Sequence, residues 1–147
     1  MARHPAELIA SAVAATIAAA TLSQTVDVER VYRPRKRNRE ELSGQPIAVW
    51  VAATSHSADN FDRGTSLHTV AIQIAVLQAL TGDAPADVDP LVGLTQEICD
   101  ALPGSLTLAE GDKAKQMTLQ TIELPDSDAL RDLIFLGVVE MEWVVRR

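Results

Sequence analysis

The order of apolar and polar positions predicts a helix at the start of the chain, followed by an exposed strand. In residues 6–22 the larger apolar side chains recur every three to four positions, which is the spacing of one helix face: Leu8, Ile9, Val13 and Ile17. Val26 and Val28 then alternate with charged residues, as in an edge strand. Pro34 is expected to end that strand, because proline has no amide hydrogen to donate to a neighbour.

The middle of the chain predicts two longer strands. Residues 47–52 carry apolar side chains on both faces, which indicates a central strand. In residues 68–76 the large apolar side chains occupy every second position, so one face of that strand is expected to be covered. The polar segment between them has turn chemistry, and we expect a long hairpin whose loop, residues 54–67, projects away from the core.

The C-terminal half repeats these signals. Asp89 suits a helix cap and Pro90 the first helical position, so a second helix is expected to begin here and to end before Pro103. Residues 116–124 predict a strand, and a short helical turn should follow. The last predicted strand, residues 133–145, is expected to be buried at its beginning and exposed or subunit-facing at its end.

These elements predict an α+β fold, in which a mainly antiparallel sheet of about five strands carries two main helices on one face. The early links between strands are expected to resemble hairpins. With 147 residues and 47% hydrophobic residues, the chain fits a single domain, residues 1–147, with projecting loops at 32–46 and 54–67.

Composition excludes several classes of function. Aromatic residues make up only 3% of the chain and the net charge is −7, so neither base stacking nor duplex binding is expected as a main task. Cys99 is the only cysteine, which excludes an intrachain disulfide and fits a reducing compartment. Residues 6–22 imitate a signal peptide, but Glu7 and the many alanines favour a helix of the folded protein over a leader or a membrane span.

Positive charge is concentrated in one polar segment between two predicted strands. Six of the 13 basic residues fall within ten positions: Arg30, Arg33, Arg35, Lys36, Arg37 and Arg39. A solvated loop balanced by Glu40 and Glu41 is one interpretation. The other is a docking arm for an acidic neighbour, because an acidic protein that segregates positive charge creates a self-complementary surface. A contact with a DNA backbone is a third use of the same residues.

Two clusters of polar residues contain the residue types of a metal site or a catalytic site. His56, Asp59, Asp62 and His68 lie in or beside the second loop, but their spacing matches no metal motif, and turn chemistry explains them as well. Glu140 and Glu142 share one face of the last strand, as an acid/base pair would. We expect them instead to form a solvated or subunit-bridging edge. No catalytic residue, metal site or cofactor is therefore predicted, and Asp59, Asp62, Arg63, Glu140 and Glu142 join the basic residues as candidate interaction residues.

The order of elements resembles that of the tail terminator, or tail completion, proteins of long-tailed bacteriophages. The resemblance rests on the helix AELIASAVAATIAAATL, the strand–arm–strand VERVYRPRKRNREELSGQPIAVWVAA, the strand LHTVAIQIAVLQAL, the helix DPLVGLTQEICDAL and the last strand LIFLGVVEMEWVV. It spans nearly the whole chain as a pattern and carries over no enzymatic residue.

This resemblance implies a structural virion protein that is not an enzyme. Proteins of that family form a ring, usually a hexamer, that caps the tail tube and faces the head connector. The implied partners are further copies of the chain, a tail tube protein and a head-side connector, with DNA passing the lumen without specific binding. The implied location is the tail or neck of the virion, and the host cytoplasm during assembly, with no membrane contact.

Other functions remain open from the sequence. A related neck or head–tail joining protein is barely separable from a terminator. More distant alternatives are a small cytosolic α+β enzyme that uses a metal in the His56 to His68 loop, and a secreted protein processed near Ala20.

Overall fold

The computed structural model describes residues 3–33 and 38–147, except for the side chain of Phe61. Six strands form one sheet in the order β1-β2-β3-β6-β5-β4. The strands are β1 (Val26–Arg30), β2 (Ile47–Asp62), β3 (Thr65–Ala79), β4 (Ser105–Thr107), β5 (Lys113–Glu123) and β6 (Ile134–Arg146). The helices in the described residues are α1 (Pro5–Ala19), α2 (Arg39–Leu42), α3 (Pro85–Ala101) and α4 (Ser127–Arg131).

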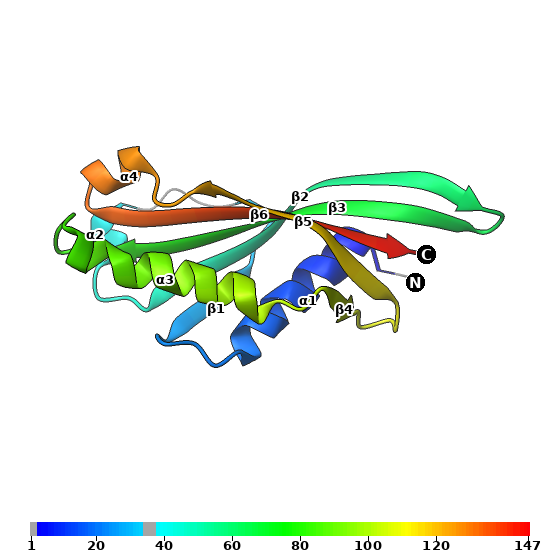
Figure 1. The fold of residues 1–147 in the computed structure, drawn as a ribbon, viewed down its shortest axis with the longest axis horizontal. Coiled ribbons are helices and arrows are strands. Elements are labelled where there is room, and N and C mark those ends of the chain that lie inside the picture. The colour runs from blue at the N-terminus through cyan, green and yellow to red at the C-terminus, as the bar shows by residue number, and fades with distance from the viewer. Residues whose placement is uncertain (1–2, 34–37) are drawn as a thin grey trace.

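The two long helices, α1 and α3, cover the same face of the sheet (Figure 1). Their buried stripes contact alternate residues of the three longest strands, and β3 lies between β2 and β6 at the centre. The largest buried side chains of this core include Trp143, Phe135, Ile72, Ile17 and Leu94. The predicted α+β class and the two helices on one face are thus confirmed, although the sheet has six strands rather than about five.

A smaller apolar cluster lies on the opposite face of the sheet. It consists of Leu42 from α2 and five strand residues: Ala48, Trp50, Ala75, Leu77 and Ile134. Ala129 of α4 is half-buried against it. The short helices therefore cover one end of this face.

Strands β1 and β2 are parallel, with Val26 beside Ile47 and Arg30 beside Val51. The expectation of a hairpin-like link between them is therefore wrong. Parallel neighbours require a crossover of a dozen or more residues, because the chain must return to the starting end of the first strand. Leu42 secures this crossover, since its side chain is only 1% exposed. Topology thus accounts for much of the length of the basic segment.

The predicted loop at residues 54–67 is instead the outer part of a β-hairpin. Strand β2 continues to Asp62 and β3 begins at Thr65, so the connection is only Arg63 and Gly64. Gly64 has φ +90°, a conformation that favours glycine in a tight turn. The polar residues of this segment suggested a loop. They instead belong to the two extended strands and face solvent on both sides of them. This hairpin forms the long tapering end of the molecule (Figure 1).

Helix α3 begins at Pro85, one turn before the predicted start at Asp89. Pro85 takes the first helical position in place of Pro90, which lies inside the helix, and the earlier start buries Val88 as well. The three-residue strand β4 was not predicted. None of the helices in the described residues is long and apolar enough to cross a bilayer.

The aromatic residue Phe135 provides a test of this core. Its side chain is 0% exposed, and its ring lies within 3.1 Å of the position that a Cβ on Gly137 would take. We expect Phe135→Ala to lower the free energy of unfolding by about 3–5 kcal/mol, because it removes buried contacts and leaves a cavity. The measurement is urea denaturation followed by circular dichroism. Tyr32→Ala is the matched control for the dissociated chain, since Tyr32 is 83% exposed there, and its effect on that chain should be small.

Candidate interaction surfaces

The candidate basic residues divide into three groups. Arg30 ends β1, and its guanidinium lies 5.1 Å from the centre of the exposed Tyr32 ring. Arg33 is exposed just beyond it. Arg39 begins α2, and its Nε donates a hydrogen bond of 3.0 Å to the carbonyl oxygen of Leu80. Arg39 therefore has a role within the fold. Arg35, Lys36 and Arg37 lie outside the described residues.

A shallow groove of about 210 Å³ lies beside Arg30 and Tyr32. It is lined by His4, Ala6, Glu7, Ala10, Arg30, Val31, Tyr32 and Ala53. The groove lies where β1 stops pairing with β2, since the last backbone contact joins the Val31 amide to the Val51 carbonyl. Beyond this point β2 continues without a partner on that side among the described residues. The groove therefore marks the beginning of an open strand edge.

The tip of the hairpin is attached to the end of β6. The Asp62 carboxylate accepts a hydrogen bond from Thr65 and forms a 2.5 Å ion pair with Arg146 of β6. The Thr65 hydroxyl, and then Arg146, lower the pKa of Asp62. Asp59 and Arg63 are exposed at the same end. Of the three candidates at this tip, Asp62 thus has partners within the chain, whereas Asp59 and Arg63 face solvent.

All three histidines of the chain meet where α1 approaches the hairpin. His56 Nε2 lies 2.9 Å from His68 Nδ1, and the two rings are 15° from parallel with centroids 5.2 Å apart. His4 meets His56 edge-on, with ring centroids 4.6 Å apart. Its Nδ1 also accepts a hydrogen bond from the amide of Ala6 at the start of α1.

This arrangement gives no support to the metal interpretation of the loop. The facing nitrogens of His56 and His68 bond to each other, so one of them carries the shared proton. Asp59 pairs with Leu67 in the sheet register, whereas His68 pairs with Ala58, so the carboxylate points to the opposite face from the histidines. Among the described residues, no three histidines, cysteines or carboxylates are arranged to hold a metal ion.

Glu140 and Glu142 lie on a central strand and not on an edge. Glu140 is flanked by Gln73 and Gln120, and Glu142 by Ala71 and Thr118. Both are half-buried on the sheet face opposite the long helices. The expected edge position is therefore wrong. Three of the four flanking residues are polar, which is typical of a solvated sheet face.

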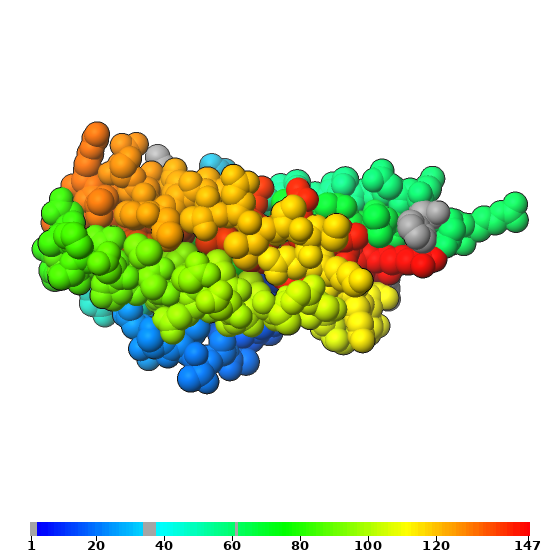
Figure 2. All heavy atoms as spheres, viewed as in Figure 1, coloured from blue at the N-terminus to red at the C-terminus, as the bar shows by residue number. Residues whose placement is uncertain are grey.

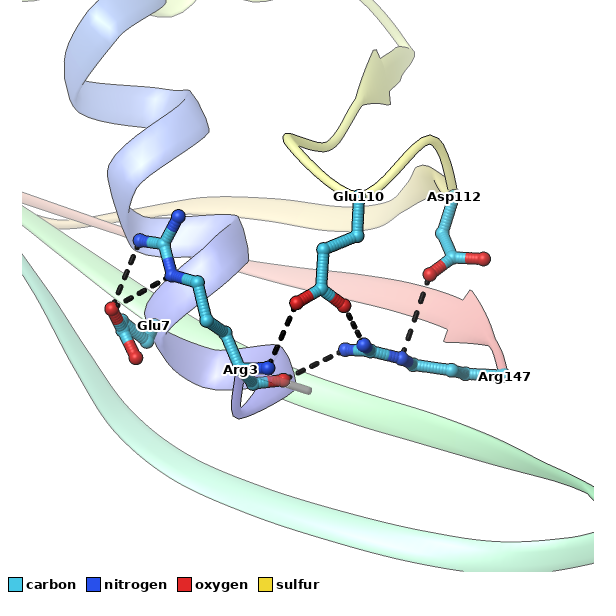
Figure 3. Close-up of polar contacts among 5 residues, drawn as sticks. All are labelled: Arg3, Glu7, Glu110, Asp112 and Arg147. Atoms are coloured by element: carbon cyan, nitrogen blue, oxygen red, sulfur yellow. Dashed lines mark hydrogen bonds and ion pairs between the residues drawn. The ribbon is translucent and has the colours of Figure 1, made fainter. Parts of the chain in front are cut away.

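A cluster of charged residues joins the two ends of the described chain (Figure 3). The Arg147 guanidinium contacts Glu110, lies 3.5 Å from Asp112, and donates a 2.8 Å hydrogen bond to the Arg3 carbonyl. The Arg3 amide donates to Glu110, and its side chain pairs with Glu7. This cluster has no local sequence signal, because its members are far apart along the chain.

The main surface that the sequence analysis missed is the outer side of β5. Five large apolar side chains are exposed in the described residues: Tyr32, Met117, Leu119, Ile122 and Leu124. Four of them lie within eight positions on or just after β5. Figure 2 shows this segment, in gold, at the surface above α3. The apolar residues in the predicted strand at 116–124 were the available signal, but the sequence alone did not say that this strand lacks a neighbour.

The histidine cluster predicts a loss of stability in mild acid. Partial burial, then His4 and His68, lower the pKa of His56 below its usual 6.5. The unfolded chain therefore binds more protons than the folded one as pH falls below about 6.5, so stability should decrease there. We expect the decrease between pH 7.5 and 5.5, measured by urea denaturation, to be smaller in His56→Gln. If stability fell with pH as steeply in His56→Gln as in the original protein, protonation of His56 would be excluded as the cause.

The terminal charge cluster is expected to make a modest, salt-sensitive contribution to the free energy of unfolding. Arg147→Ala removes contacts with two carboxylates and one carbonyl, and its side chain is only 20% exposed. We expect the free energy of unfolding to fall by about 1 kcal/mol at low salt, and less in high salt. Arg131→Ala is the control, because its 3.8 Å pair with Asp128 is largely exposed and should contribute little. Equal effects of both substitutions would contradict a specific stabilising contribution of the Arg147 contacts.

Comparison with known proteins gives a match at the level of fold. No protein-family model and no curated protein matches the sequence. Among solved structures, the chain is similar to one described as the virion of a native gene transfer agent (GTA) particle. The TM-score is 0.54 at 16% sequence identity, and the match covers 99% of this chain and 98% of the other. The two chains therefore share a fold over their whole length.

Proposed function

We propose that this protein is a structural component of a phage-like virion, and that it acts as a tail terminator. The observation that carries the proposal is the end-to-end structural similarity to a chain of a gene transfer agent virion. A match that covers 99% of one chain and 98% of the other includes the projecting hairpin as well as the core. This supports a common architecture rather than a shared core motif.

In this role several copies form a ring, most simply a hexamer, that closes the tail tube and faces the head connector. The long hairpin supports this role, because it extends polar strands beyond the helix-covered core, where a neighbouring subunit or ring can contact them (Figure 1). The exposed Asp59 and Arg63 lie at this end. A rigid sheet that carries such an extension suits assembly more directly than it suits turnover of a substrate.

The charge of the chain fits a channel for DNA. With −7 per chain, a ring of six would carry a charge of about −40. An acidic lumen lets the phosphate backbone pass without binding. The basic segment from Arg30 to Arg39 contrasts with this background, and we assign it to contact with an acidic surface on a neighbouring subunit or on the tail tube.

The first test is the assembly state of the purified chain. We expect native mass spectrometry and negative-stain imaging to show a closed ring, most simply of six copies. A monomer at the concentrations at which tails assemble would overturn the proposal. A ring that binds the connector but leaves tail length unregulated would indicate a head–tail joining protein instead.

The second test is charge reversal in the basic segment. Replacing Arg35, Lys36 and Arg37 with Glu should abolish capping of tails and leave the fold intact, because none of the three belongs to the predicted helices or strands. Capping is measured as the length distribution of tails assembled in vitro, and circular dichroism checks the fold. Tails of normal length with the reversed segment would exclude a role for it.

A further inference from the structure

The sheet has an unpaired stretch on each of its two sides. On one side β1 pairs with β2 only from Ile47 to Val51, and no described strand contacts β2 beyond it, from Thr54 to Asp62. On the other side β4 pairs with β5 from Lys113 to Lys115, and the Gln116 amide donates a hydrogen bond to the Gly104 carbonyl. No described strand lies outside β5 beyond that point. The two open stretches have similar lengths, 54–62 and 117–123.

The open stretch of β5 differs from a protected edge. Natural sheet edges usually carry charged residues, prolines, β-bulges or short strands that prevent pairing with another chain. Residues 117–122 contain two register shifts but no charged residue and no proline. Here the register with β6 skips Met117 and Ile122, so both residues are unpaired in the ladder, and they are 61% and 47% exposed. Leu119 and Leu124 are 42% and 40% exposed beside them. A concentration of exposed apolar side chains on an open strand indicates a protein interface.

Charge at the ends of the two stretches gives the direction of pairing. Strand β5 ends at Glu123, which is followed by Asp126 and Asp128. The open stretch of β2 begins beside Arg30, Tyr32 and the groove of about 210 Å³. Glu7, the one carboxylate that lines this groove, is already paired with Arg3. The acidic end of one stretch therefore matches the basic end of the other when the two strands run antiparallel.

We propose that the open stretch of β5 pairs antiparallel with the open stretch of β2 in a second copy of this chain. The inference rests on the proposed ring, and it names the contact that closes it. In this contact Ile122 and Leu124 lie near the exposed Tyr32 and the groove, while Glu123 lies near Arg30 and Arg33. Backbone hydrogen bonds between the two edges join the sheets of neighbouring subunits.

This mode of pairing follows from the sheet itself. Strand β2 is antiparallel to β3, β3 to β6 and β6 to β5, so β2 and β5 run in opposite directions within one sheet. Placing one copy beside the next, with the long helices on the same side, therefore makes the two strands antiparallel. In the sheet register Gln120 lies level with Ala52, so the second copy is also shifted along the strand direction to bring Gln120 beside Ser57. Because the paired surfaces are different, the contact is head-to-tail and generates a ring when its rotation closes.

The electrostatics of Glu123 agree with a missing cationic partner. Loss of hydration, then Asp126 and Asp128, raise the pKa of Glu123. Crowded carboxylates repel one another, and a guanidinium from a neighbouring copy would relieve that repulsion. Arg33 suits this role because it is exposed and lies just beyond β1.

Cysteine cross-linking tests the contact directly. Gln120 and Ser57 both lie on the sheet face opposite the long helices, near the middle of their open stretches. In a Cys99→Ser background, the Gln120→Cys/Ser57→Cys double variant should form a ladder of covalent oligomers with a short bismaleimide. Each single variant alone should remain uncross-linked, and a mixture of the two should give dimers. Efficient dimers from Gln120→Cys alone would mean that two β5 edges pair with each other, and would overturn the inference.

A charge swap tests the proposed direction. Arg33→Glu and Glu123→Lys should each weaken subunit association about tenfold, and the double variant should recover most of the loss. Association is measured by sedimentation as a function of concentration. Asp89→Lys on the exposed side of α3 is the matched control for Glu123→Lys and should have little effect. Additive losses in the double variant would overturn the predicted proximity.

The outcomes separate this inference from the proposed function. A ring in native mass spectrometry without cross-links in the double cysteine variant would refute the β5–β2 contact and leave the terminator proposal intact. A monomer without cross-links would refute both. If either cysteine variant failed to fold by circular dichroism, the charge swap would decide the inference.

Discussion

The whole structure depends on covering one face of the three central strands. β2 and β3 extend beyond the covered core into the exposed hairpin, whereas the covered side of β6 is buried from Phe135 to Val145. Burial of that shared apolar face fixes the register of the sheet, because a one-residue slip would turn every buried side chain outward. The outer ends of β2 and β3 can then remain polar and extended, since the covered parts of the same strands hold them in place.

The core was predictable from the sequence because its signals are local. The alternation of Val70, Ile72, Ile74 and Val76 and the helical spacing of Leu8, Ile9, Val13 and Ile17 each specify one buried face, and the structure buries all eight side chains. Topology was less accessible. The parallel pairing of β1 with β2 depends on Leu42, a single apolar residue in a polar segment, and one buried side chain gives no periodic signal.

The candidate surfaces were predictable only in part. Charge can be read from the sequence, so the basic segment was found, although Arg39 proved to be bound to the carbonyl of Leu80 within the fold. Exposure cannot be read in the same way. Met117 and Ile122 have the composition of core residues, and only the sheet order, with β5 partly without an outer neighbour, places them at the surface. Likewise, the sequence shows that the chain has three histidines, but not that their rings lie together in the fold.

The anchoring of the crossover at Leu42 has a consequence for recognition. Arg33 and Arg39 border the basic segment, and each lies beside a fixed point of the fold, the end of β1 and the buried side chain of Leu42. A segment whose two ends are fixed has fewer conformations to lose on binding than a free tail, because loop closure has already restricted it during folding. If the basic segment binds an acidic surface, as we propose, its entropic penalty is therefore smaller, and a few guanidinium groups can give useful affinity and a defined place of contact.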